Sequence, residues 1–185
     1  MTWREGFYTL EQTAGELAEI LNRERRGIVV VRIAAPSEAK TITDVINAAF
    51  RQAESFFIER DRIAVEQVQS LLQTGEFLIS GEDGTITGCV YVEMKGDRSY
   101  LGLLAVDPRA QKSGLGSKLM TAAEDHCRKA GSQFMDIQIV NLRKELPDFY
   151  RRRGYVETGI APFTAGIDTK LPCHFVKMSK ALAQS

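Results

Sequence analysis

The sequence has no excess charge of either sign and no long apolar run. Among its 185 residues, Lys plus Arg number 24 and Asp plus Glu also number 24. Phosphate binding is driven by clustered cations, so this balance argues against nucleic acid as the main partner. No stretch approaches the ~20 apolar residues that span a bilayer, so we expect no membrane-spanning helix. The segment Met1–Leu10 also lacks the apolar core of a secretory signal, and we therefore expect a cytoplasmic protein.

Residues that commonly bind metals are few. The sequence has three cysteines and two histidines, namely Cys89, Cys127, Cys173, His126 and His174. The cysteine count is odd and no CxxC spacing occurs, so we interpret the cysteines as reduced thiols. Neither histidine has a cluster of Cys or carboxylate residues beside it, and we therefore expect no metal site.

The length is sufficient for one well-buried domain. The chain contains no internal repeat and no Pro- or Ser-rich linker. Apolar residues at helical spacing predict a helix over Thr9–Arg26, which Gly27 ends. We assign residues 1–27 to an N-terminal helical extension and residues 28–185 to a single domain.

The order of elements after residue 27 predicts a mixed α/β fold around one sheet. The segment Tyr100–Val106 is continuously apolar, which is expected of a strand buried on both faces. The helix predicted over Arg143–Arg153 contains Pro147, which is tolerated only near the first turn. The predicted strands are 28–33, Phe77–Ser80, Ile86–Met94, Tyr100–Val106, Phe134–Val140, Tyr155–Thr158 and Phe175–Ser179. Three other helices are predicted: one that begins at Pro36, one over Ile63–Gln73 and one over Gly114–Lys129.

The segment that follows Val106 carries the clearest functional pattern. A buried strand ends at Asp107-Pro108, and glycines at 114 and 116 precede an amphipathic helix. Glycine allows close approach of a ligand to the backbone, and the first turn of a helix has unpaired N–H groups and partial positive charge. These features predict an anion-binding loop. Its candidate ligand-binding residues are Gln111, Lys112, Ser113, Gly114, Leu115, Gly116 and Ser117.

Two common phosphate motifs do not match this loop. A Walker A loop needs Gly-Lys-Ser/Thr, whereas the order here is Gly116-Ser117-Lys118. A dinucleotide fingerprint needs a third glycine at the position that Leu119 occupies. The pattern Gln-x-x-Gly-x-Gly after a strand resembles instead the acetyl-CoA-binding signature of the GNAT acetyltransferases. The alternative is a plain strand–loop–helix corner with glycines for tight packing.

A second segment extends the resemblance. Phe149-Tyr150 followed by Gly154-Tyr155 is similar to the second landmark of the GNAT family, and the order of elements matches from Ile28 to about Lys180. The resemblance implies the GNAT acyl-CoA N-acyltransferase fold, a mixed α/β sheet whose fourth and fifth strands diverge to admit CoA. We assign those strands to Tyr100–Val106 and Phe134–Val140.

The same resemblance implies roles for individual residues. Acetyl-CoA is the expected co-substrate, with backbone groups of Leu104, Ala105 and Val106 along its thioester arm. We interpret Gly102 as the mark of a β-bulge that frees such groups. Tyr150 is the expected proton donor to the leaving thiolate. The segment Tyr100–Val106 has no carboxylate, so Glu93 on the preceding strand is the best substitute for a general base. Asn141 is expected to make a further contact with CoA.

The resemblance implies an N-acetyltransferase that moves an acetyl group from acetyl-CoA to a primary amine of a small molecule or a protein. The alternative from another class is a module that binds acyl-CoA as a sensor without turnover. Acceptor specificity is expected in residues 50–62 and 159–174, where Arg60 and Arg62 could bind a carboxylate. The sequence leaves the acceptor and a homodimer open.

Overall fold

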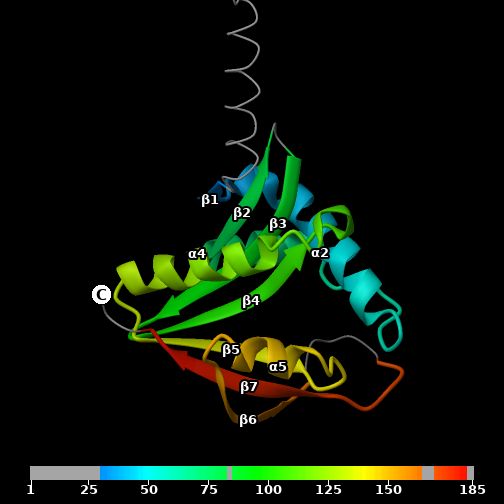
Figure 1. Cartoon of the computed structure of the whole chain (residues 1–185). Coiled ribbons are helices and arrows are strands. Elements are labelled where there is room, and N and C mark those ends of the chain that lie inside the picture. The colour runs from blue at the N-terminus through cyan, green and yellow to red at the C-terminus, as the bar shows by residue number, and fades with distance from the viewer. Residues whose placement is uncertain (1–29, 83–84, 164–168, 183–185) are drawn as a thin grey trace, which may run out of the picture. The chain divides into compact units, whose positions relative to one another are not determined.

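A seven-stranded sheet forms the centre of the described part of the chain (Figure 1). The strand order is β1-β2-β3-β4-β5-β7-β6, and every neighbouring pair is antiparallel except β4 and β5, which are parallel. Parallel neighbours need a crossover connection, and helix α4 (Leu115–Lys129) provides it. The strands are β1 (Val31–Ile33), β2 (Glu76–Glu82), β3 (Thr85–Lys95), β4 (Arg98–Val106), β5 (Phe134–Val140), β6 (Val156–Pro162) and β7 (His174–Ala181).

The computed structural model describes residues 30–82, 85–163 and 169–182. The predicted helix Thr9–Arg26 and the first residues of the predicted strand 28–33 lie outside the described residues. The predicted division at residue 27 therefore stays a prediction. Within the described residues, no helix combines the length and the apolar character needed to cross a membrane.

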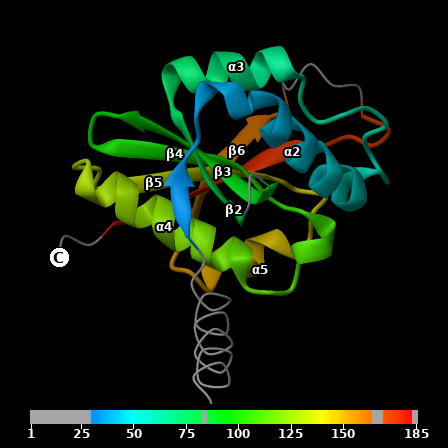
Figure 2. The ribbon, with the colours of Figure 1, turned by 90° about the horizontal axis from the view of Figure 1, so that it is seen from above.

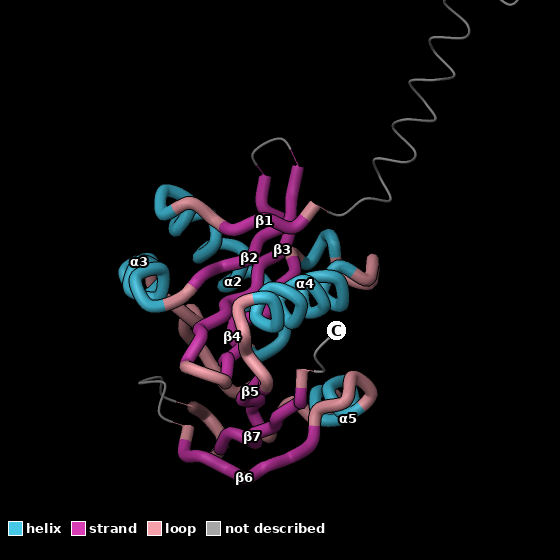
Figure 3. Tube along the Cα trace, turned by 90° about the vertical axis from the view of Figure 1, so that its left-hand side faces the viewer, coloured by secondary structure: helices cyan, strands magenta, loops and turns pink. Residues whose placement is uncertain are grey.

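Helices cover both faces of the sheet. The helices α2 (Ala39–Glu54) and α3 (Val65–Thr74) lie on one face, whereas α4 and α5 (Leu146–Arg151) lie on the other (Figures 2 and 3). Helix α2 packs there because its apolar residues recur at helical spacing and form one buried stripe. The stripe includes Ala39, Ile42, Val45, Ile46 and Ala49.

Helix α4 lies unusually close to β3 at Gly88. A Cβ atom on Gly88 would lie 2.9 Å from Leu119 Cδ1 and 3.1 Å from Leu115 Cδ2. Both distances are shorter than ordinary carbon contacts, so a larger residue at this position would require the two leucine side chains to shift. The contact fixes the N-terminal end of α4 beside the C-terminal end of β4, which is where the predicted anion-binding loop lies.

The mixed α/β fold class predicted from the sequence is confirmed, with shifts at several element ends. Helix α5 begins at Leu146 rather than at Arg143, and Pro147 lies in its first turn as expected. A short 3-10 turn, Pro36–Glu38, precedes α2. The expectation that Tyr100–Val106 is buried on both faces is wrong, because Gly102, Leu103 and Leu104 are only partly buried.

The contact between α4 and β3 leads to a stability prediction. Leu119 is fully buried, so Leu119→Ala is expected to lower the free energy of unfolding by about 2–5 kcal/mol through lost burial and a cavity. Ile160 on β6 is 70% exposed, and Ile160→Ala serves as the control with a change within about 0.5 kcal/mol. Urea unfolding measures both. Equal effects of the two substitutions would contradict the packing described here.

Candidate active site

The strands β4 and β5 pair over only part of their length. Their parallel register joins residues 98–101 of β4 to residues 134–137 of β5, and beyond these residues the two strands diverge (Figure 1). A cavity of about 330 Å³ lies where they separate, and we call it the slot. Its lining includes Gly102, Leu103 and Leu104 from β4, Gln138, Ile139 and Val140 from β5, Tyr150 from α5 and Glu54 from α2.

A β-bulge shapes the β4 side of the slot. Cys89 of β3 pairs with Ala105 and Tyr91 pairs with Gly102, so two residues of β4 stand opposite one residue of β3. The bulge lies at Leu103–Leu104, where Leu103 has a φ of 50°, rather than at Gly102 as predicted. Gly102 has a different role, since a Cβ there would lie 2.8 Å from the Tyr100 ring.

The backbone of β4 beyond the bulge presents polar groups to the slot. The Asp107 N–H donates to the Thr87 carbonyl of β3 at 2.8 Å. Because backbone groups alternate along a strand, the N–H and C=O of Ala105 also point to β3, whereas those of Val106 point away from β3. Leu104 lies in the bulge and lines the slot. The predicted role in binding the donor therefore fits Leu104 and Val106 better than Ala105. The Val106 carbonyl already accepts a hydrogen bond from Gln111 Nε2 at 3.3 Å.

The predicted anion-binding loop has the backbone geometry that such a loop needs. Lys112 and Gly114 have φ angles of 63° and 80°, and Gly114 caps the N-terminus of α4. The helical ladder begins with the Lys118 N–H donating to the Gly114 carbonyl at 3.1 Å, so the N–H groups of the preceding first turn have no intrahelical acceptor. At Gly116 an added Cβ would meet only Val106 Cγ2, at 3.7 Å. The Leu115 N–H donates to Ser113 Oγ at a long 3.4 Å. The loop thus has open space beside first-turn N–H groups that are not engaged in the helical ladder, which fits a phosphate group.

Arg153 connects this loop to α5. Its Nη2 donates to Ser117 Oγ and its Nη1 donates to the Phe149 carbonyl at 3.0 Å. Its guanidinium also lies 3.6 Å from the centre of the Phe149 ring. These contacts hold the end of α5 against the first turn of α4, at the edge of the slot.

Tyr150 lies in the slot in a neutral form. The rings of Phe149 and Tyr155 pack edge-on against it with centroid distances of 5.1 and 5.5 Å. Burial raises the pKa of Tyr150 to about 12. Among the described residues none forms a hydrogen bond with its hydroxyl, so the proton is free for a ligand.

A buried polar network supports Tyr150 from behind. The Tyr155 hydroxyl donates to Glu124 Oε1 at 3.0 Å, and Lys180 Nζ donates to Glu124 Oε2 at 2.6 Å. The network joins α4, β7 and the segment after α5. It therefore fixes the ring against which Tyr150 packs.

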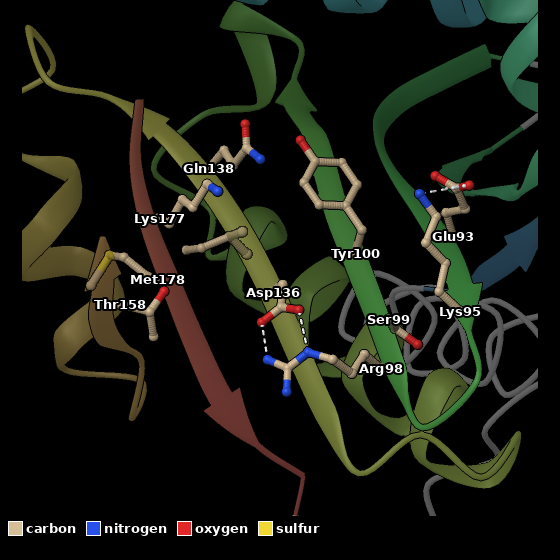
Figure 4. A pocket seen from close by; sticks show the side chains of 11 residues that line it. Glu93, Lys95, Arg98, Ser99, Tyr100, Asp136, Gln138, Thr158, Lys177 and Met178 are labelled. Carbon is tan, nitrogen blue, oxygen red and sulfur yellow. Dashed lines mark hydrogen bonds and ion pairs between the residues drawn. The ribbon is translucent and has the colours of Figure 1, made fainter. Parts of the chain in front are cut away.

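Glu93 and Asn141 lie outside the lining of the slot. Glu93 lines a neighbouring hollow of about 650 Å³, which we call the basin, and pairs with Lys95 at 3.1 Å (Figure 4). Asn141 Oδ1 accepts a hydrogen bond from the His174 N–H at 2.9 Å, which extends the pairing of β5 with β7. The residues shared by the slot and the basin are Tyr100, Ile137 and Gln138.

Sequence reasoning missed the two carboxylates of the slot, Glu54 and Glu145, of which Glu54 is the buried one. Glu54 is only 4% exposed although it is charged. It follows Phe50 by four residues, so it continues the buried stripe of α2. A charged residue at the end of an apolar stripe was the available signal, but residues 50–62 were interpreted only as an acceptor loop.

Comparison with known proteins shows the family of this chain. The family model for the acetyltransferase (GNAT) domain matches residues 43–182. The chain belongs to the GNAT acetyltransferase family. Acetyl-CoA is the co-substrate of this family, and the match covers the slot, Tyr150 and the anion-binding loop. No curated protein sequence is similar to this GNAT chain.

Solved structures share the fold at low sequence identity. The ribosomal-protein-S18-alanine N-acetyltransferase of Escherichia coli is 15% identical with a TM-score of 0.67, covering 85% of this chain and 96% of its own. The yncA protein of Salmonella typhimurium, solved with its cofactor acetyl-CoA, is 19% identical with a TM-score of 0.65 and covers 85% and 96%. A GNAT-family structure from Desulfovibrio desulfuricans is 20% identical with a TM-score of 0.65 and covers 84% and 100%.

The loop geometry predicts the effect of one added charge. Gly116→Glu is expected to abolish the thermal shift caused by acetyl-CoA, because the carboxylate would occupy the open space and repel phosphate. An acidic residue in the first turn of a helix is favourable for the helix itself, so the unliganded protein should keep its Tm. In the wild type, ligand at ~100 times its Kd adds about 2.7 kcal/mol, worth roughly 2–4 °C per kcal/mol.

The matched control adds the same charge further along α4. Thr121 is exposed, and Thr121→Glu should keep the full acetyl-CoA shift. A wild-type shift in Gly116→Glu would remove the loop from the binding site.

Proposed function

We propose that this GNAT chain transfers the acetyl group of acetyl-CoA to a primary amine by direct attack within a ternary complex. The observation that carries the proposal is the slot between β4 and β5. The slot is lined on one side by the part of β4 that has lost its β5 partner, and it contains a buried, neutral Tyr150. The predicted anion-binding loop is connected to the slot-lining Phe149 through Arg153.

Each of these features supplies one requirement of acetyl transfer. The first-turn N–H groups of α4 would hold the pyrophosphate of the donor. The backbone groups of Leu104 and Val106 would align the thioester arm, and positioning alone can supply several kcal/mol of the barrier. Tyr150 would donate its proton to the sulfur as the carbon–sulfur bond breaks.

The acceptor would reach the thioester from the basin. Tyr100, Ile137 and Gln138 line both hollows, so an amine that enters through the basin would pass these residues and meet the thioester in the slot. Charged side chains surround the basin, and Arg98 donates to Asp136 at 2.7 and 2.5 Å (Figure 4). A small amine or the end of a protein chain fits this opening.

The alternative is a GNAT module that binds acyl-CoA without turnover. The absence of a carboxylate between Arg98 and Val106 favours it. The discriminating assay is release of free thiol from acetyl-CoA in the presence of free amino acids, spermidine and short peptides. Thiol release that depends on an amine supports the enzyme. A thermal shift with acetyl-CoA but no release with any amine would support the module.

Tyr150→Phe tests the proton donor. The substitution keeps the ring and removes the proton, so kcat should fall by about 10²–10⁴-fold with little change in the KM for acetyl-CoA. Tyr91→Phe is the matched control, since its hydroxyl contacts Thr74 Oγ1 at 3.0 Å and does not line the slot. Full kcat in Tyr150→Phe would leave Tyr150 with a packing role only.

The raised pKa of Tyr150 predicts the alkaline side of the pH profile. A group with a pKa of about 12 remains protonated at lower pH, so loss of this proton cannot reduce the rate between about pH 7 and about pH 10, the ordinary tyrosine pKa. The measurement is kcat against pH at saturating acetyl-CoA. A decline in this range that disappears in Tyr150→Phe would show that the tyrosine titrates near its ordinary value.

A further inference from the structure

Glu54 is a buried carboxylate in the slot that no sequence motif assigned. It is the last residue of α2, is 4% exposed and lines the same cavity as Tyr100 and Tyr150. Ionised side chains are almost never fully buried unless they are paired. Its surroundings therefore decide whether it is structural or functional.

Two arginines face Glu54, and neither forms a hydrogen bond with it. Arg62 Nη1 lies 3.6 Å from Oε2, and Arg143 Nη1 lies 3.9 Å from Oε1. Glu54 Oε2 and Arg62 Nη1 are buried without a hydrogen-bond partner among the described residues. A structural buried ion pair normally has short, directed hydrogen bonds that offset desolvation, so this carboxylate is poorly explained by stability alone.

Both arginines are held by groups other than Glu54. Arg62 lies over the rings of Phe50 and Phe163 at 5.2 and 5.7 Å. Arg143 Nε donates to Glu145 Oε1 at 2.5 Å. The positive charges thus lie within ion-pair distance of Glu54 but form no hydrogen bond with it.

The segment that carries Arg62 is anchored by a buried amide. Asn47 Nδ2 donates to the Ile63 carbonyl at 2.9 Å, and Asn47 Oδ1 accepts from the Ile63 N–H at 3.1 Å. Since both bonds tie the residue after Arg62 to α2, the position of Arg62 relative to Glu54 is fixed by the fold.

The electrostatic balance leaves Glu54 more basic than an exposed carboxylate. Burial raises its pKa, while Arg62 and then Arg143 oppose the shift. The other titratable groups that line the slot are Tyr100 on β4, Tyr150 on α5, Arg152 after α5, and Glu145, which is bound to Arg143. A carboxylate with a raised pKa is better matched to removing a proton near neutral pH.

We propose that Glu54 is the general base of this enzyme and removes the proton from the acceptor ammonium in the slot. This inference rests on the acetyl transfer proposed above. It places the base on α2, whereas sequence reasoning had selected Glu93 on β3. Glu93 lines the basin and pairs with Lys95.

Glu54 and Tyr150 together account for every proton that moves in the reaction. The protonated amine gives one proton to Glu54, and its nitrogen then bonds to the acetyl carbon as the bond from that carbon to sulfur breaks. Tyr150 gives its proton to the leaving sulfur and recovers one from the nitrogen. The products are an amide, a thiol and one proton, which passes from Glu54 to solvent.

The decisive variant is Glu54→Gln, which keeps the size of the side chain and removes its basicity. With the best alkyl amine from the acceptor panel as probe, the rate at neutral pH should fall by about 10²–10⁴-fold. With hydroxylamine, which is unprotonated at neutral pH, the rate should remain near that of the wild type. A residue that only positions Arg62 and Arg143 would lower both rates alike, and this result would overturn the proposal.

Two measurements guard against a folding artefact. The thermal shift with acetyl-CoA should be unchanged in Glu54→Gln, and Glu66→Gln makes the same chemical change at an exposed site on α3 with no loss of rate. If Glu54→Gln does not fold, Glu54→Asp is the substitute, because it retains a carboxylate and should remain active towards the alkyl amine. The pH at which its rate rises should differ from that of the wild type. An unchanged pH profile would contradict the proposal.

Glu93→Gln separates the two carboxylates. A loss of rate and of the rising pH limb in Glu93→Gln, with full activity in Glu54→Gln, would assign the base to Glu93. If the wild type acetylates no amine of the panel and does not use hydroxylamine, the proposed acetyl transfer itself fails. If instead both the wild type and Glu54→Gln are active, only the assignment of Glu54 fails.

Discussion

The parting of β4 from β5 is the constraint on which the rest of the site depends. Backbone N–H and C=O groups strongly require partners, yet β4 loses its β5 partner after Leu101. The bulge at Leu103–Leu104 reinforces this separation. A sheet with such an unpaired inner edge is complementary to an extended ligand that carries amide groups, and the thioester arm of acetyl-CoA has this character.

The helices on the α4 face are arranged around this opening. Gly88 allows α4 to approach β3, which brings the first turn of α4 to the end of β4. Arg153 then joins α5 to that turn through Ser117. The opening in the sheet, the predicted anion-binding loop and the helix of Tyr150 are therefore connected by direct packing and hydrogen bonds.

Local sequence patterns predicted the features that depend on neighbouring residues. The strand, glycine loop and helix from Tyr100 to Lys129 share one continuous segment, so its pattern contained the geometry of the loop. The bulge was placed one residue early, because Gly102 accommodates the Tyr100 ring and the left-handed residue is Leu103. No local rule predicts a leucine with positive φ.

Features that depend on distant contacts were not predictable in this way. Alternation along β3 could not show whether Glu93 faces the slot, and the fold places it in the basin. The pairing of Asn141 with His174 depends on β7, which follows more than 30 residues later. Glu54 gains its environment from Arg62 and Arg143, and Arg143 comes from beyond β5.

The contact between Arg153 and Ser117 has a further consequence for donor recognition. It joins the first turn of α4 to the helix that carries Tyr150. If that turn holds the pyrophosphate and Tyr150 is the proton donor, as proposed, binding energy gained at the pyrophosphate would help to hold Tyr150 in its reactive position. A donor truncated to a simple thioester, without the nucleotide, would then be penalised in turnover as well as in affinity. Binding of the nucleotide half of the donor would thus raise the rate of acetyl transfer at the thioester.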